Sequence, residues 1–204
     1  MIDVSNYGYV SNRICHFGCG GIISILYGEL NKCPINYLKN FLKSDLYIVL
    51  GSSYIKGELV NFLIKKKAIN IHAGVTPFYR GSDCNFWALF DNNPHLVGST
   101  IHLLSKGLDD GSVLYHAMSK NKSSIFNYTM STLLSAFKSI GKKIKDKSIF
   151  NIKPAVLDSS LEIRYTKKIQ FNSQILKKFY KKKINLNSKK FDKSQLKDPI
   201  FFDN

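Results

Sequence analysis

The chain has 204 residues, of which 44% are hydrophobic and 13% aromatic, enough for one folded domain or a domain with a tail. Its longest apolar runs, residues 22–27 and 47–50, are far shorter than the ~20 residues that span a bilayer. The N-terminus has no basic segment followed by an apolar one, so we expect a cytoplasmic protein without a signal peptide or membrane association.

The net charge of +16 is unevenly distributed. Residues 1–140 carry 13 Lys and Arg against 8 Asp and Glu, whereas residues 141–204 carry 17 against 6. A basic tail can bind the phosphates of nucleic acid, a nucleotide sugar or a lipid surface. However, nearly all of the basic residues are lysine, and bidentate phosphate and base contacts favour arginine. We therefore expect a solvated Lys-rich surface, with nucleic-acid binding through this tail as the alternative.

The four cysteines do not form a convincing metal site. Cys15 and Cys19 flank His-Phe-Gly, which resembles half of a metal knuckle, but no second Cys/His pair lies at a matching distance. Cys33 and Cys84 stand alone. We expect reduced thiols and no bound metal.

The predicted elements begin with alternating helices and strands. Residues 34–43 predict a helix, and residues 45–50 predict a buried strand that ends at Gly51-Ser52-Ser53. Residues 56–67 have helical spacing of apolar side chains, and residues 68–72 form a second short apolar strand. A strand–helix–strand order predicts a parallel pair in a right-handed α/β unit. No clear opening strand is predicted within residues 1–34.

The remaining elements follow a long loop at residues 73–84. We expect a short helix, two strands separated by a tight loop, a long amphipathic helix and a further helix near the C-terminus, at residues 85–91, 97–104, 112–117, 124–145 and 171–182. The long helix carries one apolar stripe, formed by Leu133, Leu134, Phe137, Ile140 and Ile144. The strand at 97–104 places Thr100 and His102 on one face, without an assigned role for His102.

Three polar side chains are expected to meet at one edge of the sheet. Asn70 and His72 end the second strand, and Asp109 follows 37 residues after His72 on the tight loop, before the turn residue Asp110. Ligands of open α/β sheets bind beyond the carboxyl ends of the strands. An amide, an imidazole and a carboxylate at one point can stabilise an oxyanion and move a proton. Taken singly, these residues are more typical of a turn cap, a packing side chain and a turn former.

The segments 70–81, 98–102 and 107–111 resemble the 10-formyltetrahydrofolate-dependent formyltransferase family. The shared pattern is Asn-x-His, a loop closed by Pro and a basic-Gly pair, a Gly-x-Thr strand, and Asp-x-Gly. This family includes methionyl-tRNA formyltransferase, glycinamide ribonucleotide formyltransferase and the sugar N-formyltransferases. The resemblance extends over about residues 45–120.

The resemblance implies an α/β, three-layer Rossmann-like formyltransferase fold with a mostly parallel central sheet and a shortened N-terminal portion. Residues 1–160 would form the catalytic domain, with the shortened part at 1–44 and the motif-bearing core at 45–120. Residues 161–204 would form a Lys-rich, partly helical C-terminal extension.

The resemblance also assigns site residues. Asn70, His72 and Asp109 would be catalytic, 10-formyltetrahydrofolate would be the formyl donor, and no metal would take part. Two segments would form the folate pocket: Leu50, Gly51, Ser52, Ser53, Tyr54 and Ile55, and Leu103, Leu104, Ser105, Lys106, Gly107 and Leu108. Arg80 would contact an anionic substrate or, as the alternative, form a loop-bracing ion pair.

The implied reaction is formyl transfer to a primary amine. The amino-acid sequences of residues 73–77 and 85–89 look most like those of family members of surface-sugar biosynthesis. This resemblance predicts a nucleotide-linked amino sugar as the acceptor. The alternatives are a non-catalytic folate- or nucleotide-binding remnant, a formyltetrahydrofolate hydrolase, a methionyl-tRNA formyltransferase-like enzyme and a basic RNA-binding protein. A homodimer is a further expectation.

Overall fold

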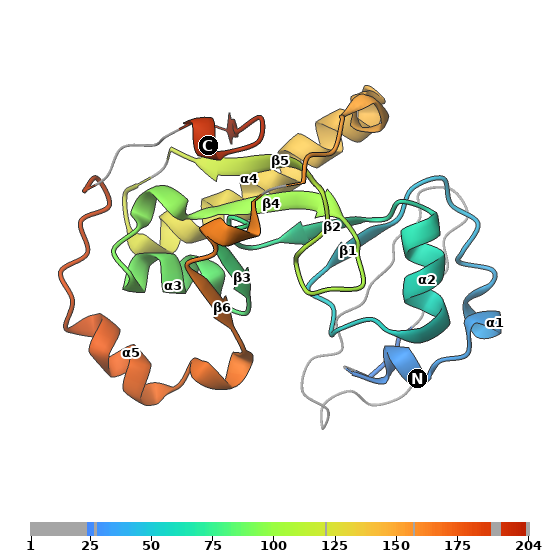
Figure 1. The fold of residues 1–204 in the computed structure, drawn as a ribbon, viewed down its shortest axis with the longest axis horizontal. Helices are drawn as coiled ribbons and strands as arrows, with labels where there is room; N and C mark the ends of the chain where they lie inside the picture. Colours follow the sequence, from blue (N-terminus) through green and yellow to red (C-terminus); the bar gives the residue numbers. More distant parts are fainter. Residues whose placement is uncertain (1–23, 27, 121, 157, 189–192, 203–204) are drawn as a thin grey trace.

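A computed structural model describes residues 24–26, 28–120, 122–156, 158–188 and 193–202 (Figure 1). Its helices are α1 (Ile35–Leu38), α2 (Gly57–Lys65), α3 (Cys84–Phe90), α4 (Ile125–Lys145) and α5 (Ser173–Tyr180). Its strands are β1 (Ile48–Leu50), β2 (Ile69–His72), β3 (Tyr79–Gly81), β4 (Gly98–Leu103), β5 (Val113–Ser119), β6 (Arg164–Thr166) and β7 (Ile200–Phe202). Short 3-10 segments lie at Glu29–Lys32, Pro94–Leu96, Ser148–Asn151, Ser159–Leu161, Lys168–Gln170 and Lys193–Gln195.

The central sheet has five strands in the order β1-β2-β4-β5-β7. β1 is parallel to β2 and β7 is parallel to β5, whereas β4 is antiparallel to both of its neighbours. Four of the five strands therefore point the same way. The predicted α/β class, the mostly parallel sheet and the parallel pair of the first two strands are confirmed.

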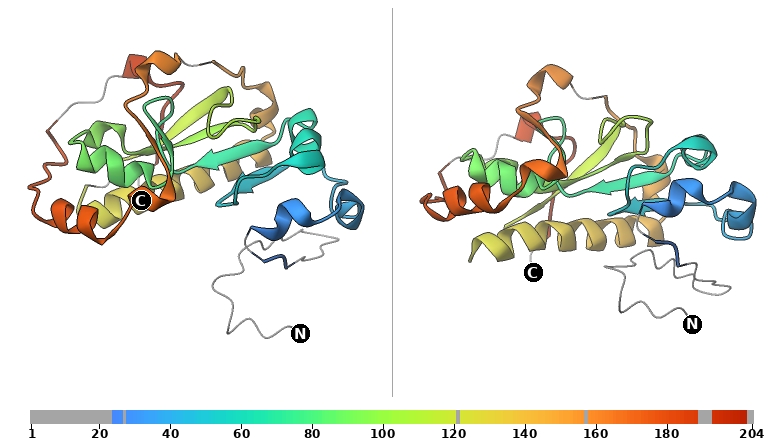
Figure 2. Two further views of the ribbon diagram at one scale, coloured as in Figure 1. Left: turned by 60° about the horizontal axis from the view of Figure 1, so that its bottom comes forward. Right: turned by 90° about the horizontal axis from the view of Figure 1, so that it is seen from below.

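The apolar core forms layers on both sides of this sheet (Figure 2). α4 runs along one face, where Ala136 and Ile140 pack against Ile101 and Tyr115. α3 lies on the opposite face together with a second sheet made of β3 and β6. α2 packs against β1 in a separate cluster. No helix in the described ranges has the length and apolar character that crossing a membrane requires.

The long helix α4 does not direct its whole predicted apolar stripe toward the sheet. It begins where the Ser124 hydroxyl accepts a hydrogen bond from the Asn127 N–H at 3.0 Å. Ile140 is buried, but Leu134 and Phe137 remain 39% and 43% exposed. The buried face consists largely of small polar side chains, which are Ser131, Thr132, Ser135 and Ser139. Their hydroxyls are satisfied by nearby partners such as the Met118 carbonyl, so small residues take positions that hydrophobicity alone would not assign to a core.

The C-terminal segment 161–204 packs against the rest of the fold. β6 pairs in parallel with β3, and β7 joins the main sheet. β3 lies within residues 73–84, which we expected to form a loop. The Arg164 guanidinium donates to both carboxylate oxygens of Asp91 at 2.8 and 2.5 Å and stacks over Trp87. The predicted helix near 171–182 is confirmed as α5. The division of the chain at residue 160 stays a prediction.

Two expectations for the N-terminal part have different outcomes. The helix expected at 34–43 is wrong in length, because only Ile35–Leu38 is helical and the chain turns after Leu38. Cys15 and Cys19 lie within residues 1–23, which are outside the described residues. Most of residues 1–34, where no opening strand was predicted, is also outside them. Cys33 and Cys84 are free thiols.

Candidate active site

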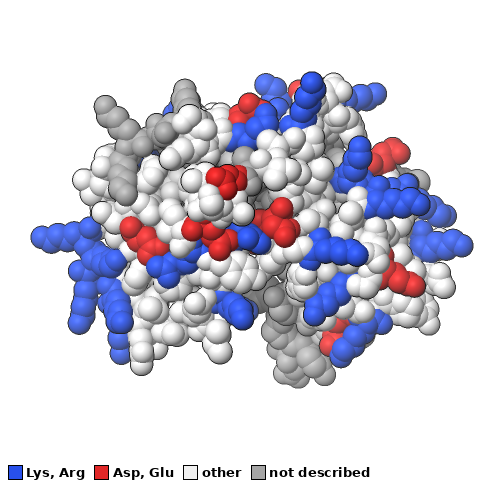
Figure 3. Space-filling view, in the orientation of Figure 1, with Lys and Arg blue, Asp and Glu red and all other residues white. Residues whose placement is uncertain are grey.

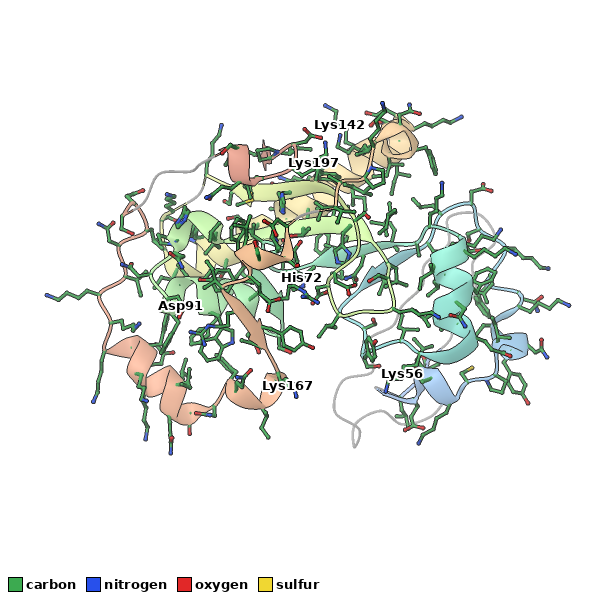
Figure 4. The ribbon with its side chains drawn as sticks, in the orientation of Figure 1. Lys56, His72, Asp91, Lys142, Lys167 and Lys197 are labelled. Carbon is green, nitrogen blue, oxygen red and sulfur yellow. The ribbon has the colours of Figure 1, made fainter. Side chains whose placement is uncertain are left out.

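The structure brings Asn70, His72 and Asp109 together at the end of β2. His72 is labelled in Figure 4, near the centre of the molecule. The Asp109 carboxylate lies 3.3 Å from His72 Nδ1 through one oxygen and 3.3 Å from Asn70 Nδ2 through the other. His72 and Asp109 are both almost fully buried. The three groups are therefore within reach of one reacting centre, as the sequence predicted.

The position of Asp109 depends on a contact with β3. Asp109 has a φ of 50°, in the left-handed region that few non-glycine residues adopt. One carboxylate oxygen accepts the Gly81 N–H at 3.1 Å. Burial alone would raise the pKa of Asp109, but His72, His102 and the Gly81 N–H outweigh it and hold the pKa below its ordinary value. Asp109 is thus an ionised, fixed carboxylate at neutral pH.

His72 is placed between two hydrogen-bond acceptors. Its Nδ1 faces Asp109, and its Nε2 lies 3.3 Å from the Tyr79 carbonyl oxygen. Burial lowers the pKa of the imidazole, while Asp109 raises it. The resting imidazole is therefore neutral, but both of its nitrogens face oxygens that accept hydrogen bonds. New negative charge beside the ring would favour the imidazolium form.

His102 is a site residue to which the sequence gave no role. Its Nδ1 lies 2.9 Å from the Leu103 carbonyl oxygen, which can only accept, so Nδ1 donates this hydrogen bond. Its Nε2 then accepts from the Asn70 amide at 3.0 Å. His102 is 1% exposed and lies opposite Asn70 in the β2–β4 register. It orients Asn70, and only the strand pairing could have revealed this.

A first cavity, which we call the loop cavity, lies beside these groups. It has a volume of about 400 Å³ and includes Asn70, His72, His102 and Asp109 in its wall. Ten of its 21 lining residues were predicted to bind folate, which are Leu50, Gly51, Ser52, Ser53, Tyr54, Ile55, Leu104, Ser105, Gly107 and Leu108. The predicted residues Leu103 and Lys106 do not line it. The Tyr54 hydroxyl donates to the Lys106 carbonyl oxygen and so joins the two loops.

Arg80 braces the loop that carries Asp109. Its guanidinium donates to the Leu108 carbonyl oxygen at 2.8 and 3.2 Å and to Glu162 at 2.9 Å. Arg80 does not line the loop cavity. These are the contacts of the loop-bracing alternative, and contact with an anionic substrate stays a prediction.

A second cavity, which we call the helix cavity, also reaches His72. Its volume is about 570 Å³, and it shares His72, Ala73, Gly81 and Leu133 with the loop cavity. The rest of its wall comes from Asp83, which precedes α3, and from α3, the first half of α4, and α5. These include the apolar and aromatic side chains Phe86, Leu89, Phe126, Leu176, Phe179 and Tyr180. The sequence did not predict this cavity, because its walls are far apart along the chain.

Charge is distributed unevenly around these features. In the view of Figure 3, acidic side chains gather near the middle of the face and many lysines project from its edges. Among the described residues, no group of three or more His, Cys, Asp and Glu side chains is arranged to hold a metal ion.

Comparison with known proteins identifies the family. Residues 37–145, more than half of the chain, match the formyl transferase family, and the chain belongs to this family. The methionyl-tRNA formyltransferase of Clostridium novyi (strain NT) is 36% identical over 88 residues, which are 42% of this chain and 28% of that protein. The corresponding protein of Synechococcus sp. (strain JA-3-3Ab) is 32% identical over 76 residues, which are 37% of this chain and 23% of that protein. The chain thus spans about a quarter of the length of these curated relatives.

Solved structures share the fold. A sugar N-formyltransferase from Shewanella sp FDAARGOS_354 has a TM-score of 0.51 and 21% identity, covering 66% of this chain and 53% of that chain. The formyltransferase PseJ from Anoxybacillus kamchatkensis has a TM-score of 0.50 and 22% identity, covering 63% of this chain and 67% of that chain. The PseJ structure is a complex with UDP-4,6-dideoxy-4-formamido-L-AltNAc and tetrahydrofolate.

Proposed function

We propose that this chain is an N-formyltransferase that moves a formyl group from 10-formyltetrahydrofolate to a primary amine. The observation that carries this proposal is the cluster of Asn70, His72 and Asp109, in which His72 lies in the walls of both cavities, so that a donor in one cavity and an acceptor in the other would meet there. A two-substrate transfer needs a donor and an acceptor that meet at one catalytic group. Family membership of the chain supports the same reaction.

The loop cavity fits the folate. Its wall combines apolar side chains such as Leu50 and Leu104 with the polar groups of Ser52 and Ser105, which suits a flat heterocycle with polar edges. Its volume of about 400 Å³ is in the range of small-molecule sites. When bound, 10-formyltetrahydrofolate supplies an electrophilic formyl carbon attached to a nitrogen leaving group.

The side chains divide the proton and charge transfers among them. Attack by the amine places negative charge on the formyl oxygen, and an N–H of His72 donates a hydrogen bond to this oxygen without a net transfer of its proton. Asn70 keeps one N–H on His102 and turns the other from Asp109, 3.3 Å away, to the same oxygen. Asp109 accepts the proton that the amine loses. Collapse of the intermediate breaks the bond to the folate nitrogen, which takes up the proton that Asp109 accepted from the amine.

An amino sugar linked to a nucleotide is the acceptor that we propose. The amino-acid sequence of residues 73–77 and 85–89 supports this acceptor, as does the fold shared with sugar N-formyltransferases. The curated relatives are methionyl-tRNA formyltransferases, so methionyl-tRNA is the second acceptor to test. The folate site and the catalytic cluster would serve either acceptor.

His72→Ala provides the test. We expect a fall in kcat of about 100- to 1,000-fold, because an oxyanion donor is lost, while tetrahydrofolate still binds. Formylation would be measured with 10-formyltetrahydrofolate and a panel of nucleotide-linked amino sugars, methionyl-tRNA and a no-amine control. Unchanged turnover in His72→Ala, or release of formate without any formylated amine in the wild type, would contradict the proposal.

Asp109→Asn and Asp110→Asn form a matched pair for the proton acceptor. Both replace a carboxylate by an amide on the same loop, but only Asp109 contacts His72 and lines the loop cavity. We expect Asp109→Asn to lower kcat about 100-fold or more and Asp110→Asn to keep it within a few-fold. Equal losses in the two variants would assign the effect to the loop rather than to the Asp109 carboxylate.

A further inference from the structure

We propose that the outer face of α4 is an interface at which two copies of this chain pair, with their α4 helices antiparallel. Met130, Leu134 and Phe137 form the centre of this interface, and we call them the interface stripe. The sequence predicted a homodimer without a location for its interface, and this inference supplies the location. It is independent of the proposed function, because none of the three residues lines the loop cavity or the helix cavity.

The two faces of α4 have the reverse of the usual distribution of side chains. A surface helix normally buries its apolar side chains and directs charged ones to solvent. In α4, small polar side chains fill the face toward the sheet, whereas Met130, Leu134 and Phe137 are 45%, 39% and 43% exposed. Their spacing of four and then three residues places them next to one another on one face. Contiguous exposed apolar surface of this kind marks an interaction site.

The apolar surface continues onto the edge strand of the central sheet. Val49 of β1 packs in the core cluster of α2, whereas its neighbour Ile48 is directed to the opposite face of the sheet and is 43% exposed. The register partner of Ile48 is Ile69, which packs in one cluster with Ala136 and Ile140 of α4. In the right-hand view of Figure 2, α4 forms the outer layer on this side of the sheet. A partner that binds α4 can therefore also cover Ile48.

The distribution of charge along α4 favours a second copy in the antiparallel direction. Residues 125–137 contain no charged side chain, whereas Lys138, Lys142, Lys143 and Lys145 lie at the C-terminal end of the helix. Parallel helices would place these lysines beside the same lysines of the partner, and this like-charge contact costs free energy. Antiparallel helices place them beside the uncharged half of the partner helix. Helices that bind a membrane surface are typically rich in lysine and arginine along their polar face, which the first half of α4 is not.

The interface stripe is complementary to itself in this direction. With a two-fold axis between positions 133 and 134, Met130 of one copy lies opposite Phe137 of the other, and Leu134 packs close to the axis. The methionine sulfur makes favourable contacts with an aromatic ring, and symmetry gives the dimer two such contacts. Because each copy uses the same patch, the interface is closed at two copies.

The experiment compares two leucine substitutions in the full chain. Leu134→Glu places two like charges at the two-fold axis, whereas Leu161→Glu makes the same change outside α4, at a leucine that is 45% exposed. Sedimentation velocity over a range of protein concentrations gives the Kd of the dimer. We expect a dimeric wild type, a Kd about thirtyfold higher or more in Leu134→Glu, and a Kd within about twofold of the wild type in Leu161→Glu. Circular dichroism checks that the helix content is unchanged, and Met130→Glu replaces Leu134→Glu if that variant does not fold.

Chemical cross-linking tests the direction of pairing. A mixture of Met130→Cys and Phe137→Cys proteins, treated with a short thiol–thiol cross-linker, should give mainly a link between positions 130 and 137, identified by peptide mass spectrometry. Either protein alone should give much less of its own symmetric link.

The dependence on salt separates the second copy from polyanionic partners. Each chain carries a net charge of +16, so salt should strengthen the dimer by screening the repulsion between the copies. Binding of nucleic acid or an anionic membrane would weaken as salt is added.

Four results would overturn the inference. They are a wild type that stays monomeric at the highest concentration that sedimentation can measure, a dimer with the same Kd in Leu134→Glu and Leu161→Glu, and a predominant link of Met130→Cys to itself, which would indicate parallel helices. The fourth is a monomer that binds phosphatidylglycerol vesicles and loses this binding in Leu134→Glu, which would assign the interface stripe to a membrane surface.

Discussion

The loop cavity and the helix cavity meet at His72 but are constructed in different ways. The loop cavity is formed mainly by two short segments that follow β1 and β4, and the Tyr54 hydroxyl links them through a backbone carbonyl. The helix cavity is formed by side chains from α3, α4 and α5, which are distant in sequence. Local segments can therefore encode the proposed donor site, whereas tertiary packing shapes the proposed acceptor site.

The two cavities nevertheless rest on one frame. Gly81 lines both of them, donates its N–H to Asp109 and belongs to β3, which pairs with β6 from the C-terminal segment. Changes in this frame should affect both cavities, and changes in one wall should affect only one. The following predictions separate these two cases.

Gly81→Ala should have the largest effect. Gly81 has a φ of +94°, and an added Cβ would lie 2.0 Å from the Thr166 carbonyl oxygen. We expect a loss of about 3 kcal/mol of unfolding free energy and weaker binding of both ligands, measured by denaturant unfolding and calorimetry. Gly141→Ala is the control, because its Cβ meets nothing within 4 Å inside α4, and it should stabilise by about 0.5–1 kcal/mol. Selective loss of one ligand in Gly81→Ala would contradict a common frame.

His116 should make the stability of the fold sensitive to acid. Its Nε2 donates to the Thr76 carbonyl oxygen at 2.9 Å, its Nδ1 accepts the Lys197 N–H at 3.0 Å, and burial lowers its pKa to about 4. The unfolded chain binds a proton first, so the contribution of His116 to stability is complete above pH 6.5 and is lost as the pH falls toward 4. Between pH 6.5 and 5 the loss should be about 2 kcal/mol.

His116→Asn removes this titration while its oxygen can still accept the Lys197 N–H. Thermal unfolding between pH 7 and 4.5 should show a smaller decrease in stability for the variant than for the wild type. Parallel curves for the two proteins would show that His116 is not the responsible group.

Arg164→Lys should weaken the clamp between β6 and α3. Lysine cannot reproduce the bidentate contact with Asp91 or the stacking over Trp87. We expect a loss of about 1–2 kcal/mol in unfolding free energy, with amine binding more affected than tetrahydrofolate binding because α3 lines the helix cavity. Lys178→Arg, at an exposed position on α5, serves as the control. A selective loss of tetrahydrofolate binding would contradict this assignment.

Tyr54→Phe should have the smallest and most selective effect. The variant removes the hydrogen bond from the Tyr54 hydroxyl to the Lys106 carbonyl oxygen, worth about 1 kcal/mol. The Kd for tetrahydrofolate should rise about fivefold while the KM for the amine stays constant. Tyr37→Phe removes a hydroxyl from a 74% exposed ring and should change neither constant. A higher amine KM in Tyr54→Phe would mean that the cavities are coupled.

The sequence predicted those parts of the site that lie within short motifs. The meeting of Asn70, His72 and Asp109 was predicted because strand ends and one tight loop place them. The two segments expected to bind folate came from the family resemblance; most of their residues line the loop cavity, and folate binding there stays a prediction. The role of His102 was missed because it depends on the β2–β4 register, which one sequence does not contain.

The helix cavity was missed for a related physical reason. Apolar side chains such as Phe126 and Tyr180 are 70% and 77% exposed at its rim, whereas periodicity assigns large apolar residues to a core. On α4, serines took the buried face because their hydroxyls find partners there. Burial of small polar groups and exposure of aromatic ones are decided by tertiary contacts, which local patterns do not specify.

A crystal structure with tetrahydrofolate and a nucleotide-linked amino sugar would test the central claim most directly, namely that the two substrates occupy different cavities and meet at His72. We predict the pteridine between residues 50–55 and 104–108, the amino-bearing ring among Phe86, Leu176 and Phe179, and the amine nitrogen beside His72. Folate in the helix cavity, or both ligands on the loop-cavity side of His72, would contradict the account.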